Sequence, residues 1–284
     1  MSTTKKKASH RLGFSPCPND TFIFHGLVTG KVSTPGIQWE PVLEDVETLN
    51  KLAFNRAIPV TKASFHAYGN LRESYLLLSA GSALGRGCGP LIVAREMMTR
   101  KQLESERIAI PGKWTSAALL LRLFAPALRA SQLIEMPFEC ILESVLNGKV
   151  GAGLIIHESR FTYAAQGLVA LEDLGRWWEE ESGLPIPLGG IIADRTLGEE
   201  TLRHINRALR ESVRHARSHP EESAEYVHRH AQELSEEVTR AHIDLYVNDF
   251  TEDLGEMGLK AINALFRYAE AKGILLPFEG SLTL

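Results

Sequence analysis

The sequence predicts an α/β fold that ends in a helical region, and two observations carry this prediction. Over roughly the first 195 residues, short apolar runs alternate with stretches whose apolar residues recur every three or four positions. After them nearly every segment has the helical period, and the strand–helix–strand order before them predicts parallel sheets. The predicted strands are residues 11–14, 38–43, 60–63, 75–79, 91–94, 108–110, 133–136, 153–156 and 188–193, and helices are predicted after Asp20, Asp45, Thr115, Pro137 and Asp173, each near a residue that favours a helix start.

Two apolar stripes in the C-terminal region predict helices that pack on a core. The first stripe runs up to Pro220, which should end its helix, and the second runs up to Gly273, a predicted C-terminal cap. Residues 117–128 form the most apolar segment, but Arg122 interrupts it and it is shorter than the ~20 residues of a membrane span, so we expect a buried helix. The stripes consist of Leu202, Ile205, Leu209, Val213 and Ala216, and of Leu259, Ile262, Leu265, Phe266 and Ala269.

The composition is that of an ordinary globular protein of one or two domains. The 284 residues are 44% hydrophobic and 23% charged, and a net charge of −4 offers no basic field for nucleic acid. Cys17, Cys88 and Cys140 form no CxxC pair, so neither a disulfide framework nor a cysteine zinc site is predicted. The lysines at 5–7 are not followed by the apolar stretch of a signal peptide. We therefore expect a cytoplasmic protein with no nucleic-acid or membrane partner.

A loop with two prolines and short polar side chains, residues 15–20, joins a predicted strand to a predicted helix. Asn19 or Asp20 can cap this helix, whose first N–H groups would face the crevice beyond the strand's carboxyl end. A cap and turn without a ligand is an equally good interpretation. Cys17 in this loop is either a reactive thiol near a helix start or an inert buried one.

A second loop, residues 110–117, has the pattern of an anion-binding helix start. Gly112 permits a tight turn, and the hydroxyls of Thr115 and Ser116 precede an apolar helix whose first N–H groups favour a carboxylate or a phosphate. The GxxxxGK[ST] spacing of a P-loop is absent, so a small carboxylate is as good a ligand as a nucleotide phosphate. Plain N-capping is the alternative.

A histidine follows the apolar run at 153–156. Ligands of open α/β sheets lie beyond the carboxyl ends of strands, and histidine is suited to proton transfer near neutral pH, so His157 is a candidate general base. A structural histidine is the alternative, and Glu158 or Arg160 would either orient the site or be solvated.

Lys62 and Ser64 offer a cation and a hydroxyl at another strand end, where a surface lysine is the simpler interpretation.

Two other patterns indicate no specific chemistry. The glycine-rich segment 85–90 lacks dinucleotide spacing and is interpreted as a flexible loop or a close backbone approach. His215 and His219 lie four residues apart, with His228 and His230 further on, but the glutamate of an HExxH metal site is missing, so solvated helix faces are expected.

Taken together, these loops resemble the 1,4-dihydroxy-6-naphthoate synthases of the futalosine route to menaquinone. The resemblance spans most of the chain and is specific, since several strings occur in one order. They are SPCPNDTF at 15–22, EPVLEDVETLN at 40–50, ALGRGCGPL at 83–91, GLIIHESRFTY at 153–163 and LPIPLGG at 184–190.

The resemblance implies a two-lobed, periplasmic-binding-protein-like (type II) fold with a ligand cleft between the lobes. Residues 1–100 and 190–284 would form the first, discontinuous lobe, and residues 101–189 the second. It also implies that His157 is the proton acceptor and that Lys62, Ala63, Ser64, Ser116 and Ala117 bind substrate. Ser116 stands where threonine is common in that family, which keeps the hydroxyl. His66 is a competitor for the base if it points into the cleft.

The implied reaction is a lyase reaction: cyclic dehypoxanthinylfutalosine gives 1,4-dihydroxy-6-naphthoate and dihydroxyacetone by acid/base-assisted carbon–carbon cleavage and aromatisation. No metal or organic cofactor is implied. The partner is a small carboxylate, and a homodimer is possible. Two alternatives stay open: a non-catalytic carboxylate-binding protein, and chorismate dehydratase of the same pathway.

Overall fold

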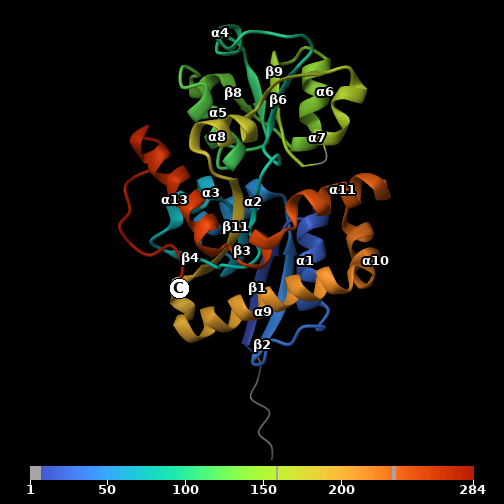
Figure 1. Ribbon diagram of the computed structural model, residues 1–284, viewed down its shortest axis with the longest axis vertical. Helices are drawn as coiled ribbons and strands as arrows, with labels where there is room; N and C mark the ends of the chain where they lie inside the picture. Colours follow the sequence, from blue (N-terminus) through green and yellow to red (C-terminus); the bar gives the residue numbers. More distant parts are fainter. Residues whose placement is uncertain (1–7, 158, 232–234) are drawn as a thin grey trace, which may run out of the picture. The chain divides into compact units, whose positions relative to one another are not determined.

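Two β-sheets organise the chain in the computed structural model, which describes residues 8–157, 159–231 and 235–284 (Figure 1). Each sheet belongs to its own structural unit. Unit 1 consists of Met1–Ala83, Gly189–Gly255 and Phe278–Leu284, and unit 2 of Leu84–Leu188 and Glu256–Pro277.

The unit boundaries differ from those expected, and strand pairing and side-chain packing explain why. Residues 84–100 fall in unit 2 because their strand, Leu91–Ala94, pairs with two strands of the unit 2 sheet. Most of the C-terminal helix Gly255–Ala271 also falls in unit 2, where the ring of Tyr268 meets the buried Trp178 edge-on at 6.1 Å between centroids.

The unit 1 sheet has the order β2-β1-β3-β11-β4, with β5 paired to β11. β1 runs parallel to β2 and β3, whereas β11 runs antiparallel to β3 and β4. Its strands are β1 (Ala8–Phe14), β2 (Ile37–Leu43), β3 (Val60–Ser64), β4 (Tyr75–Leu77), β5 (Ala83–Gly85) and β11 (Ile186–Asp194), and the helical elements of this unit are α1 (Pro18–Val28), α2 (Val46–Phe54), α3 (Phe65–Leu71), η4 (Arg195–Leu197), α9 (Glu199–Ser218), α10 (Pro220–His230), α11 (Glu236–Tyr246) and α12 (Asp249–Glu252).

The unit 2 sheet has the order β10-β6-β9-β7-β8, in which β7 runs parallel to β8 and β9 while β6 runs antiparallel to β9 and β10. Its strands are β6 (Leu91–Ala94), β7 (Ile108–Ile110), β8 (Leu133–Glu135), β9 (Ala152–Ile155) and β10 (Val169–Asp173), and its helical elements are α4 (Arg100–Leu103), α5 (Ser116–Phe124), η1 (Ala130–Gln132), η2 (Phe138–Cys140), α6 (Ile141–Leu146), α7 (Ser159–Thr162), η3 (Ala164–Gln166), α8 (Leu174–Ser182) and α13 (Gly255–Ala271).

All nine predicted strands are present, but the prediction of parallel sheets is only half right. The antiparallel strands β6 and β11 are the ones by which the chain enters unit 2 and returns to unit 1. Such a strand is not reached through a β-α-β crossover, so the rule that makes successive strands parallel does not apply to it. The short strands β5 and β10 were not predicted.

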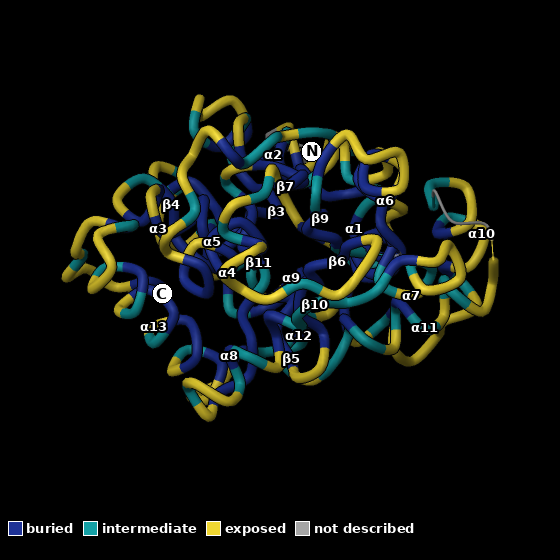
Figure 2. The backbone as a smooth tube through the Cα atoms, turned by 90° about the horizontal axis from the view of Figure 1, so that it is seen from above, coloured by how far each residue is buried: buried dark blue, intermediate teal, exposed yellow. Residues whose placement is uncertain are grey.

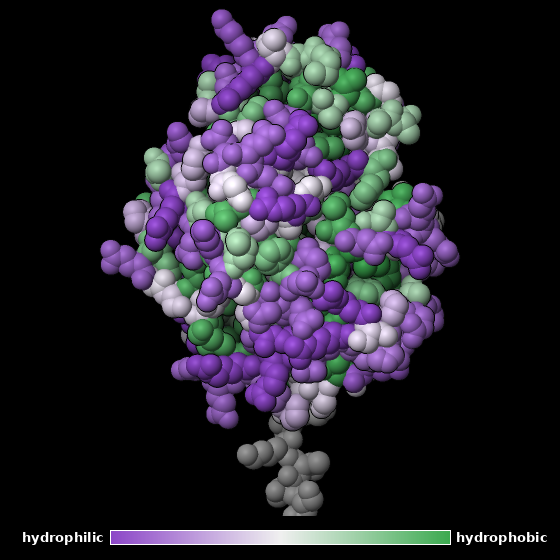
Figure 3. Space-filling view, in the orientation of Figure 1, coloured by the Kyte–Doolittle hydropathy of each residue, from purple (hydrophilic) through white to green (hydrophobic). Residues whose placement is uncertain are grey.

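The core of unit 1 forms around α1, which is buried along nearly its whole length and packs against α9, α10 and α11 (Figure 2). The first predicted stripe faces this core, and α9 stops just before Pro220 as expected. The outward side of α9 is covered by hydrophilic side chains (Figure 3). Gly273 has a φ of 67° at the end of α13, which confirms the cap.

Residues 116–124 form the expected buried helix α5. No helix in the described part of the chain combines the length and the apolar character of a membrane span.

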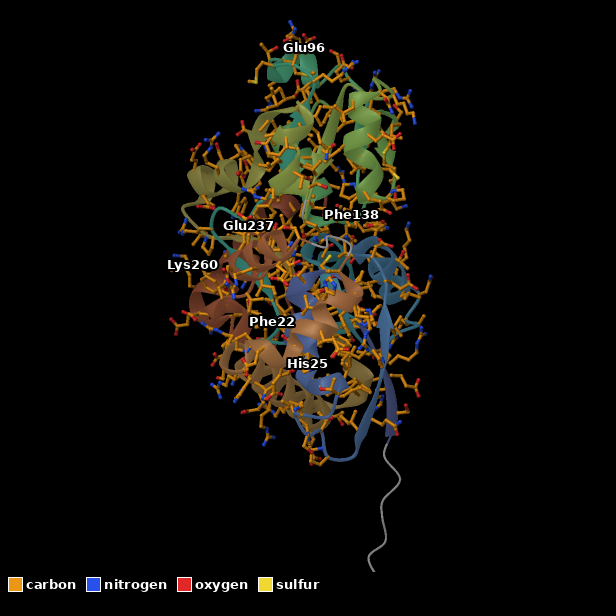
Figure 4. All side chains as sticks on the ribbon, turned by 90° about the vertical axis from the view of Figure 1, so that its right-hand side faces the viewer. Phe22, His25, Glu96, Phe138, Glu237 and Lys260 are labelled. Carbon is orange, nitrogen blue, oxygen red and sulfur yellow. The ribbon has the colours of Figure 1, made fainter. Side chains whose placement is uncertain are left out.

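A buried histidine in unit 1 makes stability sensitive to mild acid. His25 lies on α1 (Figure 4), next to Tyr226 and near His215, Glu222 and Lys31. Burial lowers the pKa of His25 below 6.5, the positive charge of His215 lowers it further, and Glu222 opposes this. As the pH falls through 6.5 the unfolded chain therefore binds a proton that the folded protein does not, and the free energy of unfolding decreases.

Urea unfolding at about pH 7.5 and about pH 5.5 should show this loss, and His25→Leu should reduce it. His228→Leu, at an exposed position on α10 outside this group of residues, is the control and should keep the wild-type pH dependence. An unchanged pH dependence in His25→Leu would contradict the assignment.

Candidate functional site

Two loops of unit 2 emerge at the same edge of its sheet. β7 and β9 are parallel neighbours, with Ile108 opposite Ala152 and Ala109 opposite Gly153. β7 leads into the loop before α5, and β9 leads into His157. Because the carboxyl ends of parallel neighbouring strands meet at the same edge of a sheet, the start of α5 and His157 both lie beyond this edge.

The hydroxyls at the start of α5 are engaged within the protein. Thr115 is the N-cap: its Oγ1 donates to Gly112 O at 2.8 Å and accepts from Ala118 N at 3.1 Å. Ser116 Oγ donates to Leu188 O at 2.5 Å. The expectation that these hydroxyls add donors for an anion is therefore wrong for this structure.

The backbone N–H groups that remain at this helix start are those of Ser116 and Ala117. Among the described residues neither has a hydrogen-bond acceptor, and both residues are buried. They lie at the positive end of the helix dipole, so the start of α5 can bind a carboxylate through the main chain.

His157 sits in a rare backbone conformation. Its φ is 54°, in the left-handed region, which histidine tolerates better than most side chains but which still has an energetic cost. The residue is half-buried, and its imidazole meets the ring of Phe138 edge-on at 5.1 Å between centroids. Such strain at a chemically suitable side chain is typical of functional sites.

Arg160 is a structural clamp for the segment after His157. Its guanidinium donates to the carbonyls of Gly87 and Gly89 and pairs with Asp173 at 2.9 Å. It thus ties α7 to the glycine-rich loop and to the N-cap of α8. The alternative of a solvated Arg160 is wrong, and Glu158 lies outside the described residues.

The backbone of the glycine-rich loop lies close to the backbone of Gly175 at the start of α8. This agrees with one of the two interpretations of the loop, a close backbone approach. A Cβ on Gly89 would lie 2.2 Å from the Cα of Gly175, so only glycine fits there. Burial raises the pKa of Cys88 in this loop to about 12, so its thiol stays protonated and unreactive near neutral pH.

In unit 1, the carboxylate of Asp20 accepts hydrogen bonds from Ser15, in the loop after β1, and from Lys62 of β3. Its Oδ1 accepts from Lys62 Nζ at 2.5 Å, and its Oδ2 accepts from Ser15 Oγ at 2.8 Å and from Ser15 N at 3.1 Å. The side chains of Lys62 and Asp20 are only 8% and 2% exposed, so this is a buried ion pair.

The predicted caps of α1 are therefore wrong. The N-cap is Cys17, which is buried and makes no side-chain cap, while Asn19 and Asp20 lie in the first turn and bind other side chains. Lys62 pairs with Asp20, so the interpretation of Lys62 as a surface lysine is also wrong.

Sequence reasoning missed two residues that hold this region. His242 of α11 is fully buried and meets Asn19 Oδ1 through its Nε2 at 3.0 Å. Because Asn19 Nδ2 donates to Asp20 Oδ1, its Oδ1 accepts, so Nε2 of His242 carries the proton. Asn50 of α2 binds the backbone N–H of Ser64 at 2.9 Å and its Oγ at 3.2 Å.

The remaining candidates also belong to unit 1. Ala63 and Ser64 end β3, and His66 is buried in α3 directly after them. His215 pairs with Glu222 at 3.2 Å and stacks on the exposed His219. In the described ranges no group of three or more His, Cys, Asp or Glu side chains is arranged to hold a metal ion.

The fold is that of periplasmic binding proteins. A Candida albicans protein described as having the generic periplasmic-binding-protein fold matches with a TM-score of 0.68 at 11% identity over 96% of this chain and 92% of its own. A crystal structure of a protein from Archaeoglobus fulgidus matches with a TM-score of 0.88 at 40% identity over 94% and 98%. The predicted α/β, periplasmic-binding-protein-like fold with a helical C-terminal region is confirmed.

The sequence comparison gives the family. The profile of the menaquinone biosynthesis family matches residues 10–271, so the chain belongs to this family. A curated relative from Thermus thermophilus named 1,4-dihydroxy-6-naphthoate synthase is 53% identical over 94% of this chain and 96% of its own. One of the same name from Streptomyces coelicolor is 44% identical over 93% and 94%. The resemblance seen in the sequence is confirmed, and the chain is an enzyme of menaquinone biosynthesis.

Proposed function

We propose that this enzyme converts cyclic dehypoxanthinylfutalosine to 1,4-dihydroxy-6-naphthoate with release of dihydroxyacetone. The names of the two curated relatives support this reaction. The observation that carries it is the arrangement in unit 2. There, a histidine in a strained backbone conformation and a helix start, two of whose N–H groups have no acceptor among the described residues, follow neighbouring parallel strands.

These two groups suit the two tasks of the reaction. The N–H groups of Ser116 and Ala117 bind the substrate carboxylate, which fixes the ring system relative to His157. His157 then acts as the base that moves a proton, so that a retro-aldol-type cleavage releases the three-carbon fragment and the remaining ring becomes aromatic. Lys62, which pairs with Asp20, and Ser64, which Asn50 binds, are proposed together with Ala63 as further substrate-binding residues.

The test is product formation by the purified protein. Incubation with cyclic dehypoxanthinylfutalosine should give 1,4-dihydroxy-6-naphthoate and dihydroxyacetone in equal amounts, detected by liquid chromatography with mass spectrometry. Incubation with chorismate should give no dehydration product. Conversion of chorismate would identify the dehydratase instead, and substrate binding without any product would identify a carboxylate-binding protein.

We also propose that the enzyme works in the cytoplasm as a protein that binds a small carboxylate. The three cysteines support this, because all lie in the described part of the chain and none forms a disulfide. Fractionation of the source cells should recover the activity with cytoplasmic markers, and recovery with an exported fraction would contradict the proposal.

Main-chain recognition of the carboxylate predicts an unusual pair of variants at Ser116. Proline fits the first position of a helix, and Thr115 before it has the extended conformation that a following proline requires, with φ −70° and ψ 149°. Ser116→Pro removes the N–H together with the hydroxyl, whereas Ser116→Ala removes the hydroxyl alone. Because a hydrogen bond to a charged group contributes about 1.5–3 kcal/mol, KM should be about 10–100-fold higher in Ser116→Pro than in Ser116→Ala.

Steady-state kinetics measure this ratio, and circular dichroism checks that both variants keep their helix content. Equal KM values in two folded variants would show that this N–H does not bind the substrate.

A further inference from the structure

The ring of Phe138 lies against the imidazole of His157. The two centroids are 5.1 Å apart with an interplanar angle of 61°, an edge-on arrangement that aromatic rings prefer. Phe138 begins η2 (Figure 4), a short 3-10 turn between β8 and α6. Its contact with His157 therefore joins two segments that are distant in the sequence but belong to the same unit.

Phe138 is itself anchored in the hydrophobic core of unit 2. It packs, partly buried, against a cluster of residues from β6, β7, β9, α6 and the segments beside them. Contact with such a close-packed core restricts the rotamers of the ring, so the ring offers a defined surface to whatever lies against it. The cluster consists of Leu91, Val93, Ala109, Ile141, Leu142, Val145, Val150, Ile155 and Leu168.

His157 has a particular need for a fixed surface. It follows the end of β9, its backbone has a φ of 54°, and it is only half-buried. Its carbonyl accepts from Arg160 N at 3.3 Å, a bond that fixes the backbone of this turn. Proton transfer requires the imidazole within hydrogen-bond reach of the reacting atom, and misplacement by about 1 Å lowers the rate strongly.

We propose that Phe138 is a positioning residue for His157: its core-anchored ring holds the imidazole in the orientation from which His157 moves the proton. The inference rests on the proposed function, because only a catalytic His157 makes this contact relevant to the rate. Phe138 itself does no chemistry.

Two substitutions separate the ring from simple apolar bulk. Phe138→Leu keeps the contact with the core but removes the aromatic ring, and Phe138→Tyr keeps the ring. An aromatic pair contributes modestly beyond its buried area, so kcat should fall about 5–10-fold in Phe138→Leu with little change in KM, and Phe138→Tyr should restore most of it. Ile134→Val, in the same partly buried layer around the cluster, is the control for packing and should leave kcat unchanged.

A readout without turnover completes the experiment. In NMR spectra of the full chain, the His157 ring protons should show a ring-current shift that Phe138→Leu abolishes and Phe138→Tyr retains. Phe138→Met is the second ring-free variant should Phe138→Leu fold poorly.

The outcomes distinguish this inference from the proposed function. Full kcat in a folded ring-free variant, with His157→Asn inactive, overturns the role of Phe138 and leaves the function standing. Equal loss of kcat in Phe138→Tyr and Phe138→Leu also overturns it, since the ring would then not be responsible. Activity retained in His157→Asn overturns the proposed role of His157, and with it the role of Phe138 in the rate.

Discussion

Replacing His157 by asparagine should lower kcat by about 10²–10⁴-fold while the protein stays folded, because positioned acid/base groups contribute a factor of that size. Asparagine is the best substitution here: it tolerates the left-handed backbone conformation that His157 adopts at φ 54°, so the loop should keep its geometry. Its amide cannot accept and return a proton near neutral pH as imidazole does. Steady-state kinetics with the cyclic substrate measure the effect.

A histidine outside the site provides the matched control. His219→Asn changes an exposed histidine in unit 1 and should leave kcat within experimental error. Thermal unfolding of both variants should occur at nearly the wild-type temperature. Near-wild-type turnover in a folded His157→Asn would remove His157 from the mechanism, and His66, buried beside Ser64, would be the next base to test.

The largest effect on stability should come from Asp20→Ala. The change leaves the Lys62 ammonium buried without its carboxylate partner and removes the acceptor of Ser15 and Asn19. Breaking a buried ion pair from one side destabilises a protein by about 3–5 kcal/mol, and urea unfolding should show a loss of that size.

Two comparisons isolate the cause of that loss. Asp20→Leu combined with Lys62→Met removes both charges and should recover the part of the stability lost to the unpaired charge, while the bonds of Ser15 and Asn19 stay lost. Glu225→Ala breaks the ion pair with Arg229, which has the same 2.5 Å separation but side chains 86% and 63% exposed, and should have an effect below about 1 kcal/mol. A loss in Asp20→Ala as small as that in Glu225→Ala would mean that burial does not control the strength of the Asp20–Lys62 pair.

Much of the fold could be predicted from local sequence patterns. The stripe from Leu202 to Ala216 and the stop at Pro220 are properties of one helix and need no tertiary information. β5 and β10 were not predicted, because neither has a clear apolar alternation: β5 has only three residues, and every residue of β10 is half-buried. The direction of β11 could not be inferred, because it depends on how the chain returns from unit 2.

In the candidate site, too, some features could be predicted from the local sequence and others could not. The rule that ligands lie beyond strand ends was enough to select His157 and the start of α5, because each follows its strand directly. What each polar group binds depends on distant residues: Asp20 and Lys62 are 42 positions apart, and Ser116 reaches Leu188 across 72. Nothing in the local sequence of either partner indicates these bonds.

The engaged hydroxyls of Thr115 and Ser116 have a consequence for mutational surveys of this protein. With the side chains turned toward Gly112 and Leu188, the groups left for an anion are peptide N–H groups, which every residue except proline possesses. An alanine scan would therefore pass over this part of the chain as functionally silent, and a proline scan would be needed to detect it.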